Sequence, residues 1–475
     1  MALVSLRQSA VAAWGLALAL AFGLAALIPP LQSPDEIGHL HRAYMISQGQ
    51  LLLSPMPAQA HSEEPPPGLG DFMAQVCRSG GSTGGMVDEA LLRFGAAHLA
   101  LVRDAGFRYS EQQRQALDQL AWSGSSRFCV APGAGYYFPA VYAPQAAGLA
   151  IGRGLGLGVS HSYWLARGLT LLACLGILWL AFGRCTPNPL ALALLLLPMT
   201  VFQLLSPTID GLTTALSVLA LSLFVQSAEP GRSHTAGASW SLAACIFVLA
   251  TSRTHLLPLL ALPFFLCWRR RSPRDFWLGL ATATGALAWT LFALHSSSDT
   301  RVLRAHTTAQ LLAHYAADPL AYGRLVMASL ADRELSTFYQ QSFIGILGWL
   351  DTRLPAYAYP TLWSGLGLSA LASFSLQSLR RDWSARLLLL ALALASAALV
   401  FLALLVTWTP HPAALVQGVQ GRYFIVPALL VAYAAGGFSV MRKGSPRAQW
   451  SAAAVVAFAL CALGALTLTL IRRYH

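Results

Sequence analysis

About eleven apolar segments, most of them as long as a membrane-spanning helix, dominate this sequence. A helix needs about 20 residues to cross the hydrocarbon core of a bilayer. The segments are rich in Leu, Ala and Val and show no alternation of period two, so they predict helices and not a β-barrel. The sequence therefore predicts an all-α integral membrane protein with about 11 transmembrane helices. The segments lie at residues 10–29, 163–183, 189–206, 208–227, 237–252, 254–268, 275–295, 356–378, 385–408, 422–440 and 449–471.

Composition agrees with this class and argues against a nucleic-acid-binding protein. Only 11% of the 475 residues are charged and 56% are hydrophobic, whereas soluble domains carry about 25% charged residues. The net charge is +12, but the arginines stand in short clusters between apolar segments. That pattern is typical of cytoplasmic loops of membrane proteins and not of a basic surface for nucleic acid.

The basic clusters also predict the topology of a single membrane domain spanning residues 1–475. We expect the loops at 267–275, 379–386 and 441–447 to be cytoplasmic. Counting from them places residues 30–162 in a long first outer loop and residues 296–355 in a second one. The stretch 136–158 contains prolines, an arginine and several glycines, so we expect a helix in the outer interface there. The short segments 237–252 and 254–268 form either one re-entrant pair or two tilted spans.

The first outer loop contains two of the seven cysteines, Cys77 and Cys129. An oxidising outer compartment permits a disulfide between them. The same loop carries a helical pattern in EALLRFGAAHLALVRDAG (89–106). The other five cysteines lie in or beside apolar segments without metal-ligand spacing, so a structural zinc site is not expected and no metal ligand is assigned.

The string PPLQSPDEIGHLHRAYMISQGQ (29–50) directly follows the first apolar segment. Ser33 is a favourable N-cap, Pro34 suits the first helical position, and Glu36 completes a Ser-x-x-Glu capping box. Gly49 is a natural end for this helix of about fifteen residues. Capping therefore explains Glu36 without any catalytic role.

The polar face of the same helix is harder to explain by capping. Asp35, His39 and Arg42 follow one another at spacings of four and three residues, which places them on one face of an amphipathic interfacial helix. Charged residues so close to lipid are costly unless they are paired or functional. From composition alone, a capped interfacial helix and a functional site are both open.

Several strings resemble the bacterial domain-of-unknown-function family 2142. They are the string at 29–50, YYFPAVYAPQAAGLAIGR with YWLARGLTLL (136–173), SPTIDGLTTALSVLALSLF (206–224), FIGILGWLDTRLP (343–355) and VQGVQGRYFIVPALL (416–430). This family is similar to the C-type glycosyltransferases (GT-C), among them protein O-mannosyltransferases and the lipid A aminoarabinose transferase. Those proteins carry an acidic residue just beyond the first span, as here. Their usual HPPL string is replaced by YYFPAVY, which leaves the acceptor side open.

The resemblance implies a glycosyltransferase of the bacterial inner membrane whose active site faces the periplasm. Its expected donor is a sugar on a polyprenyl phosphate, and its acceptor is a glycan, lipid or protein at the outer surface. Inverting transfer needs one carboxylate as general base, and not the two flanking carboxylates of glycosidases. We assign the base to Asp35, and Glu36 either caps the helix or contacts the acceptor.

A departing lipid phosphate needs cationic donors, preferably the planar fork of arginine. The predicted topology places Arg253, His255 and Arg422 at outer ends of spans, together with Asp210. Interfacial snorkelling of the arginines and helix capping by Asp210 are the alternatives. The expected substrate-binding residues are His39, Arg42, Asp210, Arg253, His255, Trp349, Asp351, Gln420, Arg422 and Tyr423.

Two other classes of function are compatible with a polytopic membrane protein. A transporter or flippase of lipid-linked sugars would place ionisable residues in the middle of broken spans. A non-catalytic assembly factor for surface polysaccharide would need no acidic residue at the first membrane exit. The sequence does not define the sugar, the acceptor or the oligomeric state, and it leaves a divalent metal requirement open.

Overall fold

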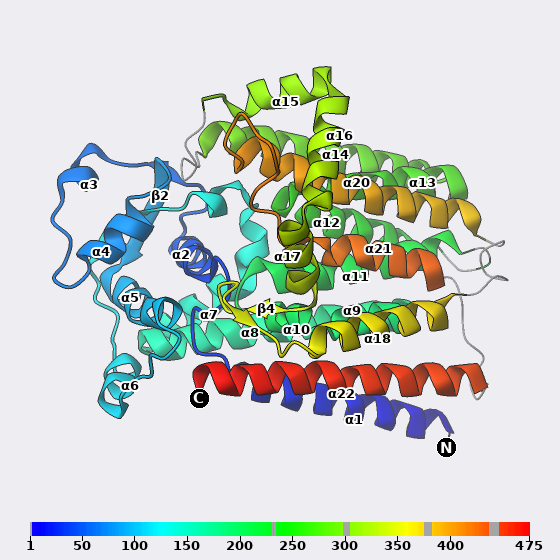
Figure 1. Cartoon of the computed structure of the whole chain (residues 1–475), viewed down its shortest axis with the longest axis horizontal. Coiled ribbons are helices and arrows are strands. Elements are labelled where there is room, and N and C mark those ends of the chain that lie inside the picture. The colour runs from blue at the N-terminus through cyan, green and yellow to red at the C-terminus, as the bar shows by residue number, and fades with distance from the viewer. Residues whose placement is uncertain (1, 230, 232–233, 298–304, 375–381, 437–445) are drawn as a thin grey trace.

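The computed structural model describes residues 2–229, 231, 234–297, 305–374, 382–436 and 446–475 (Figure 1). In these ranges the chain is mainly helical, and five helices are long and apolar enough to cross a membrane. They are α8 (Val159–Arg184), α11 (Ile209–Ala228), α14 (Pro273–Ser296), α20 (Trp383–Thr407) and α22 (Pro446–Tyr474). The predicted helical, multi-pass membrane class is confirmed, whereas the count of about 11 spans stays a prediction.

Other apolar helices, all but α1 shorter than these five, lie in the remaining predicted segments. Residues 189–206 do not form one span but two short helices separated at Pro198, because proline lacks a backbone N–H and disfavours helix in the residue before it. Residues 254–268 begin as a 3₁₀ helix and continue as an α-helix. The set comprises α1 (Ala2–Ala26), α9 (Pro189–Leu195), α10 (Pro198–Leu204), α12 (Ala236–Ser252), η4 (Thr254–Leu260), α13 (Ala261–Arg270), α18 (Ala358–Ser373), η5 (Gly421–Phe424) and α21 (Ile425–Gly436).

The long helices run side by side, and α1 and α22 lie together at one edge of the bundle (Figure 1). Trp14 of α1 makes an edge-to-face contact with Trp179 of α8, with ring centroids 5.0 Å apart. At the other end of α1, the side chain of His475 lies 3.2 Å from the carbonyl oxygen of Leu27. These contacts place the first and last described helices against the same bundle.

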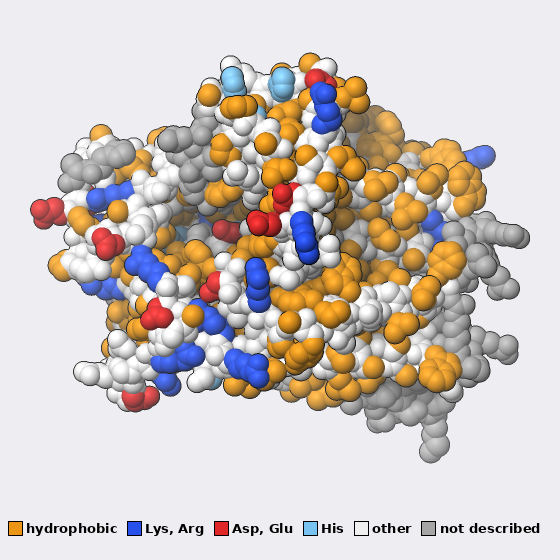
Figure 2. All heavy atoms as spheres, in the orientation of Figure 1, with side chains coloured by type: hydrophobic (Ala, Val, Ile, Leu, Met, Phe, Trp, Pro, Cys, Tyr) orange, Lys and Arg blue, Asp and Glu red, His pale blue; other side chains and the backbone are white. Residues whose placement is uncertain are grey.

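A lobe formed by the chain between α1 and α8 lies at one end of the bundle, and charged side chains gather on it (Figures 1 and 2). It contains a three-stranded antiparallel sheet of order β1-β2-β3, and a disulfide joins Cys77 to Cys129. Helix α5 confirms the helical pattern predicted at 89–106. The elements are α2 (Glu36–Ser47), β1 (Ser54–Pro55), α3 (Ala58–Ser62), α4 (Gly70–Phe72), η1 (Met73–Cys77), β2 (Thr83–Asp88), α5 (Glu89–Arg103), α6 (Glu111–Asp118), β3 (Ser126–Val130), η2 (Gly133–Tyr136), η3 (Pro139–Tyr142) and α7 (Ala143–Gly154).

Helix α2 differs from the amphipathic interfacial helix predicted for this segment. Most of its residues are buried, polar ones included, because α7, β2, η2 and η3 surround it. It is also shorter than expected, since Asp35 and not Ser33 is the N-cap residue, and the helix ends at Ser47. The polar face of α2 therefore meets protein groups, not a membrane surface.

The segment after α14 contains α15, which lies at the edge of the molecule, and two helices that cross the bundle (Figure 1). Helices α16 and α17 run steeply across the long helices (Figure 1). A small apolar cluster packs them against α20 and the segment that follows it, with Tyr339 and Phe401 in edge-to-face contact. The elements are α15 (Thr308–Ala317), α16 (Pro319–Ala331), α17 (Arg333–Ile344) and the two-stranded hairpin of β4 (Ile346–Leu347) and β5 (Thr352–Arg353).

Candidate functional site

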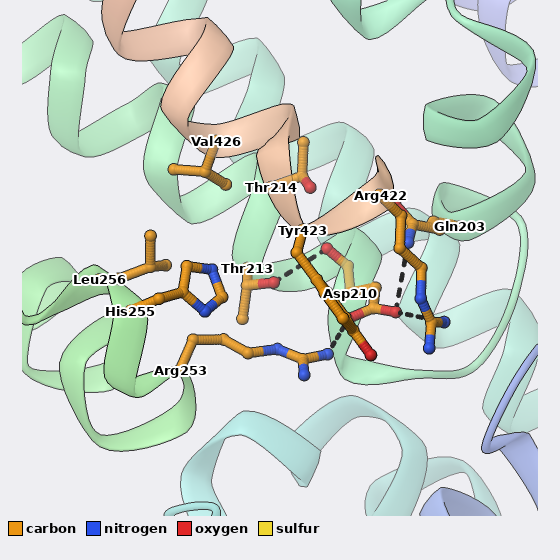
Figure 3. Close-up of a pocket in the computed structure, with 10 residues that line it drawn as sticks. All are labelled: Gln203, Asp210, Thr213, Thr214, Arg253, His255, Leu256, Arg422, Tyr423 and Val426. Atoms are coloured by element: carbon orange, nitrogen blue, oxygen red, sulfur yellow. Dashed lines mark hydrogen bonds and ion pairs between the residues drawn. The ribbon is translucent and has the colours of Figure 1, made fainter. Parts of the chain in front are cut away.

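Four charged side chains form a continuous chain of ion pairs where the lobe meets the bundle. Arg422 donates to Asp35 at 3.1 Å and to Asp210 at 3.2 Å, and Arg253 pairs with the other carboxylate oxygen of Asp210. Figure 3 shows Asp210 between the two guanidinium groups. Two carboxylates and two guanidinium groups thus alternate, so their formal charges balance.

Helix ends from distant parts of the sequence supply these residues. Asp210 lies in the first turn of α11, where a carboxylate matches the helix dipole. Arg253 directly follows α12, and Arg422 lies in η5 just before α21. Gly421 allows this approach, because a Cβ atom there would collide with backbone atoms of Tyr339 and Phe343.

Asp35 is the member of the chain that a ligand can reach. Its side chain is 60% exposed, whereas those of Arg422 and Asp210 are 2% and 10% exposed. Asp35 also adopts a left-handed backbone conformation with φ of 63°. Such conformations cost energy in residues other than glycine, although aspartate tolerates them better than most, and they gather at functional sites.

A small pocket extends behind the ion pairs (Figure 3). Its volume is about 20 Å³, which is room for one water-sized group. A sugar therefore does not fit inside this pocket and would have to lie on the exposed side, over Asp35. The lining residues are Gln203, Asp210, Thr213, Thr214, Arg253, His255, Leu256, Arg422, Tyr423 and Val426.

His39 lies one turn after Asp35 and joins the site through two tyrosines. Its Nδ1 is 2.8 Å from the hydroxyl of Tyr142, and its ring stacks on Tyr137, which lies under the guanidinium of Arg253. Burial lowers the pKa of His39 to about 3, with Arg253 and Arg422 adding to the effect and Asp35 opposing it. At neutral pH this side chain is uncharged and serves as a hydrogen-bonding group.

Glu36 is buried and holds the backbone that precedes α2, whereas its contact with the acceptor stays a prediction. Its buried carboxylate accepts hydrogen bonds from the backbone N–H of Ser33 at 2.8 Å and of Leu31 at 3.2 Å, and from the hydroxyl of Tyr163 at 2.6 Å. The reciprocal half of the predicted capping box is missing, because the Ser33 hydroxyl has no partner among the described residues. Burial raises the pKa of Glu36, with Arg167 opposing this effect.

Three further predicted residues lie outside the site. Arg42 donates to the carbonyl oxygens of Gln50 and Leu51, where it holds the chain that leaves α2. Asp351 pairs with Arg473 at the end of α22. The indole N–H of Trp349 donates to the carbonyl oxygen of Leu31 at 3.0 Å, so this side chain braces the backbone that precedes Asp35. The remaining predicted residues meet at the site, and Gln420 is 2.6 Å from the Nε of Arg422.

His41 forms a separate buried group with the disulfide. Its Nδ1 is 3.5 Å from the sulfur of Cys129, and the possible ligand atoms of His41, Cys77 and Cys129 all lie within 4.8 Å of one another. The disulfide engages both sulfurs, and thiolates are the form in which cysteine binds metal. This group could therefore hold a metal only after reduction.

Comparison with known proteins identifies the family. The chain matches the family described as "Predicted membrane protein (DUF2142)" over residues 18–432. It belongs to this family. No curated protein and no solved structure gave a significant match. The family description names a membrane protein and no activity, so a function for this DUF2142 protein has to be argued from its site.

Several uncharged polar residues of the site in this DUF2142 protein are not among the residues predicted from the sequence. Gln203 donates to Asp210 at 3.3 Å, and Thr213 and Thr214 line the pocket. Tyr137 and Tyr142 come from the string YYFPAVY, which stood out only because it replaces another motif. Uncharged polar residues are common at helix ends, so their presence in the sequence does not mark a site. Only their contacts in the structure reveal them.

Proposed function

We propose that this protein is a GT-C-like membrane glycosyltransferase that transfers a sugar, with inversion, from a polyprenyl phosphate to an outward-facing glycan, lipid or protein. The supporting observation is the Asp35–Arg422 ion pair, in which an exposed carboxylate meets a buried guanidinium that also holds Asp210. The proposal includes about 11 spans in the bacterial inner membrane, with Asp35 facing the periplasm.

In the proposed reaction, Asp35 accepts the proton of the acceptor hydroxyl as its oxygen attacks the anomeric carbon. The bond between the anomeric carbon and the phosphate oxygen breaks, and the polyprenyl phosphate leaves with the electron pair. Arg422 and Arg253 stabilise the negative charge that develops on this phosphate, because one guanidinium group can donate two parallel hydrogen bonds to two phosphate oxygens. One carboxylate is enough for this chemistry.

The small pocket supports a particular order of events. The donor phosphate has no space behind the ion pairs, so it has to compete with Asp35 for Arg422. When the phosphate binds Arg422 in place of Asp35, Asp35 loses its cationic partner. The pKa of its carboxylate then rises, which makes it a better proton acceptor. Donor binding would thus activate the base just when the sugar is in place.

The positions of the charged residues favour an enzyme over a transporter. Transporters place coupling residues near the middle of the membrane, commonly in broken helices. Here Asp210 and Arg253 lie at the start of α11 and directly after α12. The site therefore lies at helix ends, where a membrane-embedded lipid phosphate and a water-soluble acceptor group can meet.

The test is sugar transfer by the purified protein in detergent, because a flippase has nothing to flip without a membrane. Mass spectrometry of lipid-linked glycans from a deletion strain first identifies the sugar-carrying lipid that accumulates. Incubation of that lipid with purified protein and acceptor extract should release polyprenyl phosphate and move the sugar. A protein that never consumes the accumulated lipid, while restoring the strain, would be a transporter or assembly factor.

A further inference from the structure

A second cavity lies between α15, α16 and the segment that follows α20. Its volume is about 670 Å³, which is within the range of about 300–1,000 Å³ for small-molecule sites. It shares no lining residue with the pocket at Asp210. The lining residues are Ala305, His306, Gln310, Leu311, His314, Tyr315, Ala321, Arg324, Leu325, His411, Pro412 and Ala413.

The polar side chains of this cavity include groups that can donate hydrogen bonds, and no carboxylate is among its lining residues. Arg324 is the cationic member, and its side chain is 78% exposed. Its contact with Asp318 is loose at 3.8 Å, and the other oxygen of Asp318 already caps the backbone of α16. A cavity with this donor set suits an anion that can replace Asp318 at Arg324.

Histidines complete the polar side of the cavity, and Figure 2 shows histidine side chains at the surface over α15. The two ring nitrogens of His411 face the hydroxyl of Tyr315 at 3.1 Å and the carbonyl oxygen of Thr409 at 3.0 Å. These contacts fix the orientation of its ring. His306 and His314 lie on exposed positions of the cavity wall and are accessible to a ligand.

Large exposed apolar side chains lie on the two helices that line this cavity. Leu320 and Met327 of α16 are 78% and 65% exposed, and Leu312 of α15 is also exposed. Inside the cavity, Leu311 and Leu325 form an apolar wall. A ligand with a small anionic head and apolar chains matches both parts, whereas a free sugar or peptide would leave the apolar rim uncovered.

We propose that this second cavity binds the phosphate headgroup of an anionic membrane lipid. Arg324 contacts the phosphate, His306 and His314 donate further hydrogen bonds, and the acyl chains lie along Leu320 and Met327. The site is separate from the one at Asp35. One segment connects them, however, because His411 lines the second cavity and Arg422 lies eleven residues later in the same stretch of chain.

Hydrogen bonds hold this connecting segment to α16, which lines the second cavity, and to the neighbouring helix α17. The backbone N–H of Val416 donates to Ser329 of α16 at 2.8 Å, and that of Gly421 donates to Ser342 of α17 at 2.7 Å. A lipid bound between α15, α16 and His411 would therefore stabilise the segment that carries Arg422. Lipid binding should raise the melting temperature of the full chain.

The test measures lipid binding to the purified full chain in neutral detergent. Dioctanoyl phosphatidylglycerol is the probe, with dioctanoyl glycerol and inorganic phosphate as separate arms, followed by native mass spectrometry and melting temperature. Only the phospholipid should bind tightly.

Arg324→Gln should weaken its binding about tenfold or more, since charge-assisted hydrogen bonds to phosphate are lost. Arg333→Gln, which removes an exposed arginine of α17 outside the cavity, should bind as the unmodified chain does.

A second variant tests the cavity itself. Ala321→Trp fills the space and leaves Arg324 in place, so it should also weaken binding, while Asp35→Asn should not. Equal affinities of Arg324→Gln and Arg333→Gln, or binding of dioctanoyl glycerol as tight as that of the phospholipid, would overturn the proposal. Inorganic phosphate binding as tightly as the phospholipid would overturn the lipid assignment and make the cavity a site for free anions.

Discussion

The guanidinium of Arg422 lies 3.1 Å from the carboxylate of Asp35, although 387 positions separate the two residues in the chain. The same guanidinium lies 3.2 Å from Asp210 of α11. One buried side chain thus connects the lobe, which supplies Asp35, to the helical bundle. Substitutions at either residue of this pair therefore alter the ion pair that the lobe's exposed carboxylate makes with the bundle.

Asp35→Asn is expected to abolish most of the sugar transfer while leaving the fold intact. Asparagine keeps the size of the side chain but cannot accept the acceptor's proton, and general-base help is worth about 10²–10⁴ in rate, or about 3–5 kcal/mol of barrier. Asp35 is 60% exposed and Arg422 keeps Asp210 as its ion-pair partner, so loss of the Asp35 charge should cost only about 0–1 kcal/mol of stability. The measurement is the transfer rate of purified variants with matched melting temperatures.

Asp351→Asn is the matched control for this prediction, because Asp351 is also ion-paired and partly exposed but lies outside the site. It should retain the transfer rate of the unmodified chain. Full activity of Asp35→Asn would remove Asp35 from the mechanism and leave it as a structural partner of Arg422.

Arg422→Lys is expected to weaken use of the donor more than the unchanged charge suggests. A lysine ammonium cannot bond to Asp35 and Asp210 in the way that a planar guanidinium does, and it binds phosphate as a point charge. The apparent KM for the polyprenyl-phosphate sugar should rise at least tenfold. Arg473→Lys, which alters the other arginine–aspartate pair, should change melting temperature without changing this KM. Equal KM values for the two variants would contradict a donor role for Arg422.

The charged part of the site was predictable because charges at the ends of apolar segments are conspicuous in a sequence. Asp210, Arg253 and Arg422 were selected on that ground, and the structure brings them together. Trp349 and Asp351 have suitable chemistry, but their partners, Leu31 and Arg473, come from remote parts of the chain. Only the tertiary structure reveals that these two side chains are otherwise engaged.

The environment of α2 was not predictable from its pattern. Polar residues on one helical face look the same whether water, lipid headgroups or protein carbonyl groups satisfy them. Arg42 illustrates this, since backbone carbonyl oxygens hold its buried guanidinium. The split of residues 189–206 was also missed, although Pro198 marked it, because hydropathy averaged over a window hides a single helix-breaking residue.

Glu36→Gln is expected to lower stability more than activity. The carboxylate of Glu36 accepts three hydrogen bonds in a buried position, and a glutamine amide offers only one acceptor oxygen. Leaving a buried donor without a partner costs about 1–3 kcal/mol. The melting temperature should fall, and Glu111→Gln at an exposed position of α6 is the control. An unchanged melting temperature together with lost transfer would instead place Glu36 in the chemistry.

Cysteine labelling from outside the cell tests the orientation of the chain. In a background whose free cysteines are replaced by alanine, Gln112→Cys places a thiol on α6 of the lobe, and Thr186→Cys places one after α8. Both positions are exposed. An impermeant maleimide should label Gln112→Cys in intact cells and label Thr186→Cys only after permeabilisation. The reverse pattern would place Asp35 in the cytoplasm and exclude a donor presented at the outer surface.

His98 of α5 predicts how the stability of the lobe depends on pH. Burial lowers its pKa to about 4 from an ordinary value of 6.5, while a hydrogen bond to the carbonyl oxygen of Phe94 and the charge of Asp118 oppose the shift. Below pH 6.5 His98 binds a proton in the unfolded chain but stays unprotonated in the folded chain. The free energy of unfolding is therefore highest above pH 6.5 and falls as the pH drops towards 4, by roughly 3 kcal/mol at most. His98→Gln should make the melting temperature depend less on pH between pH 4.5 and 7, whereas His306→Gln at an exposed position should leave this dependence unchanged. Identical slopes for the two variants would show that His98 titrates freely in the folded protein.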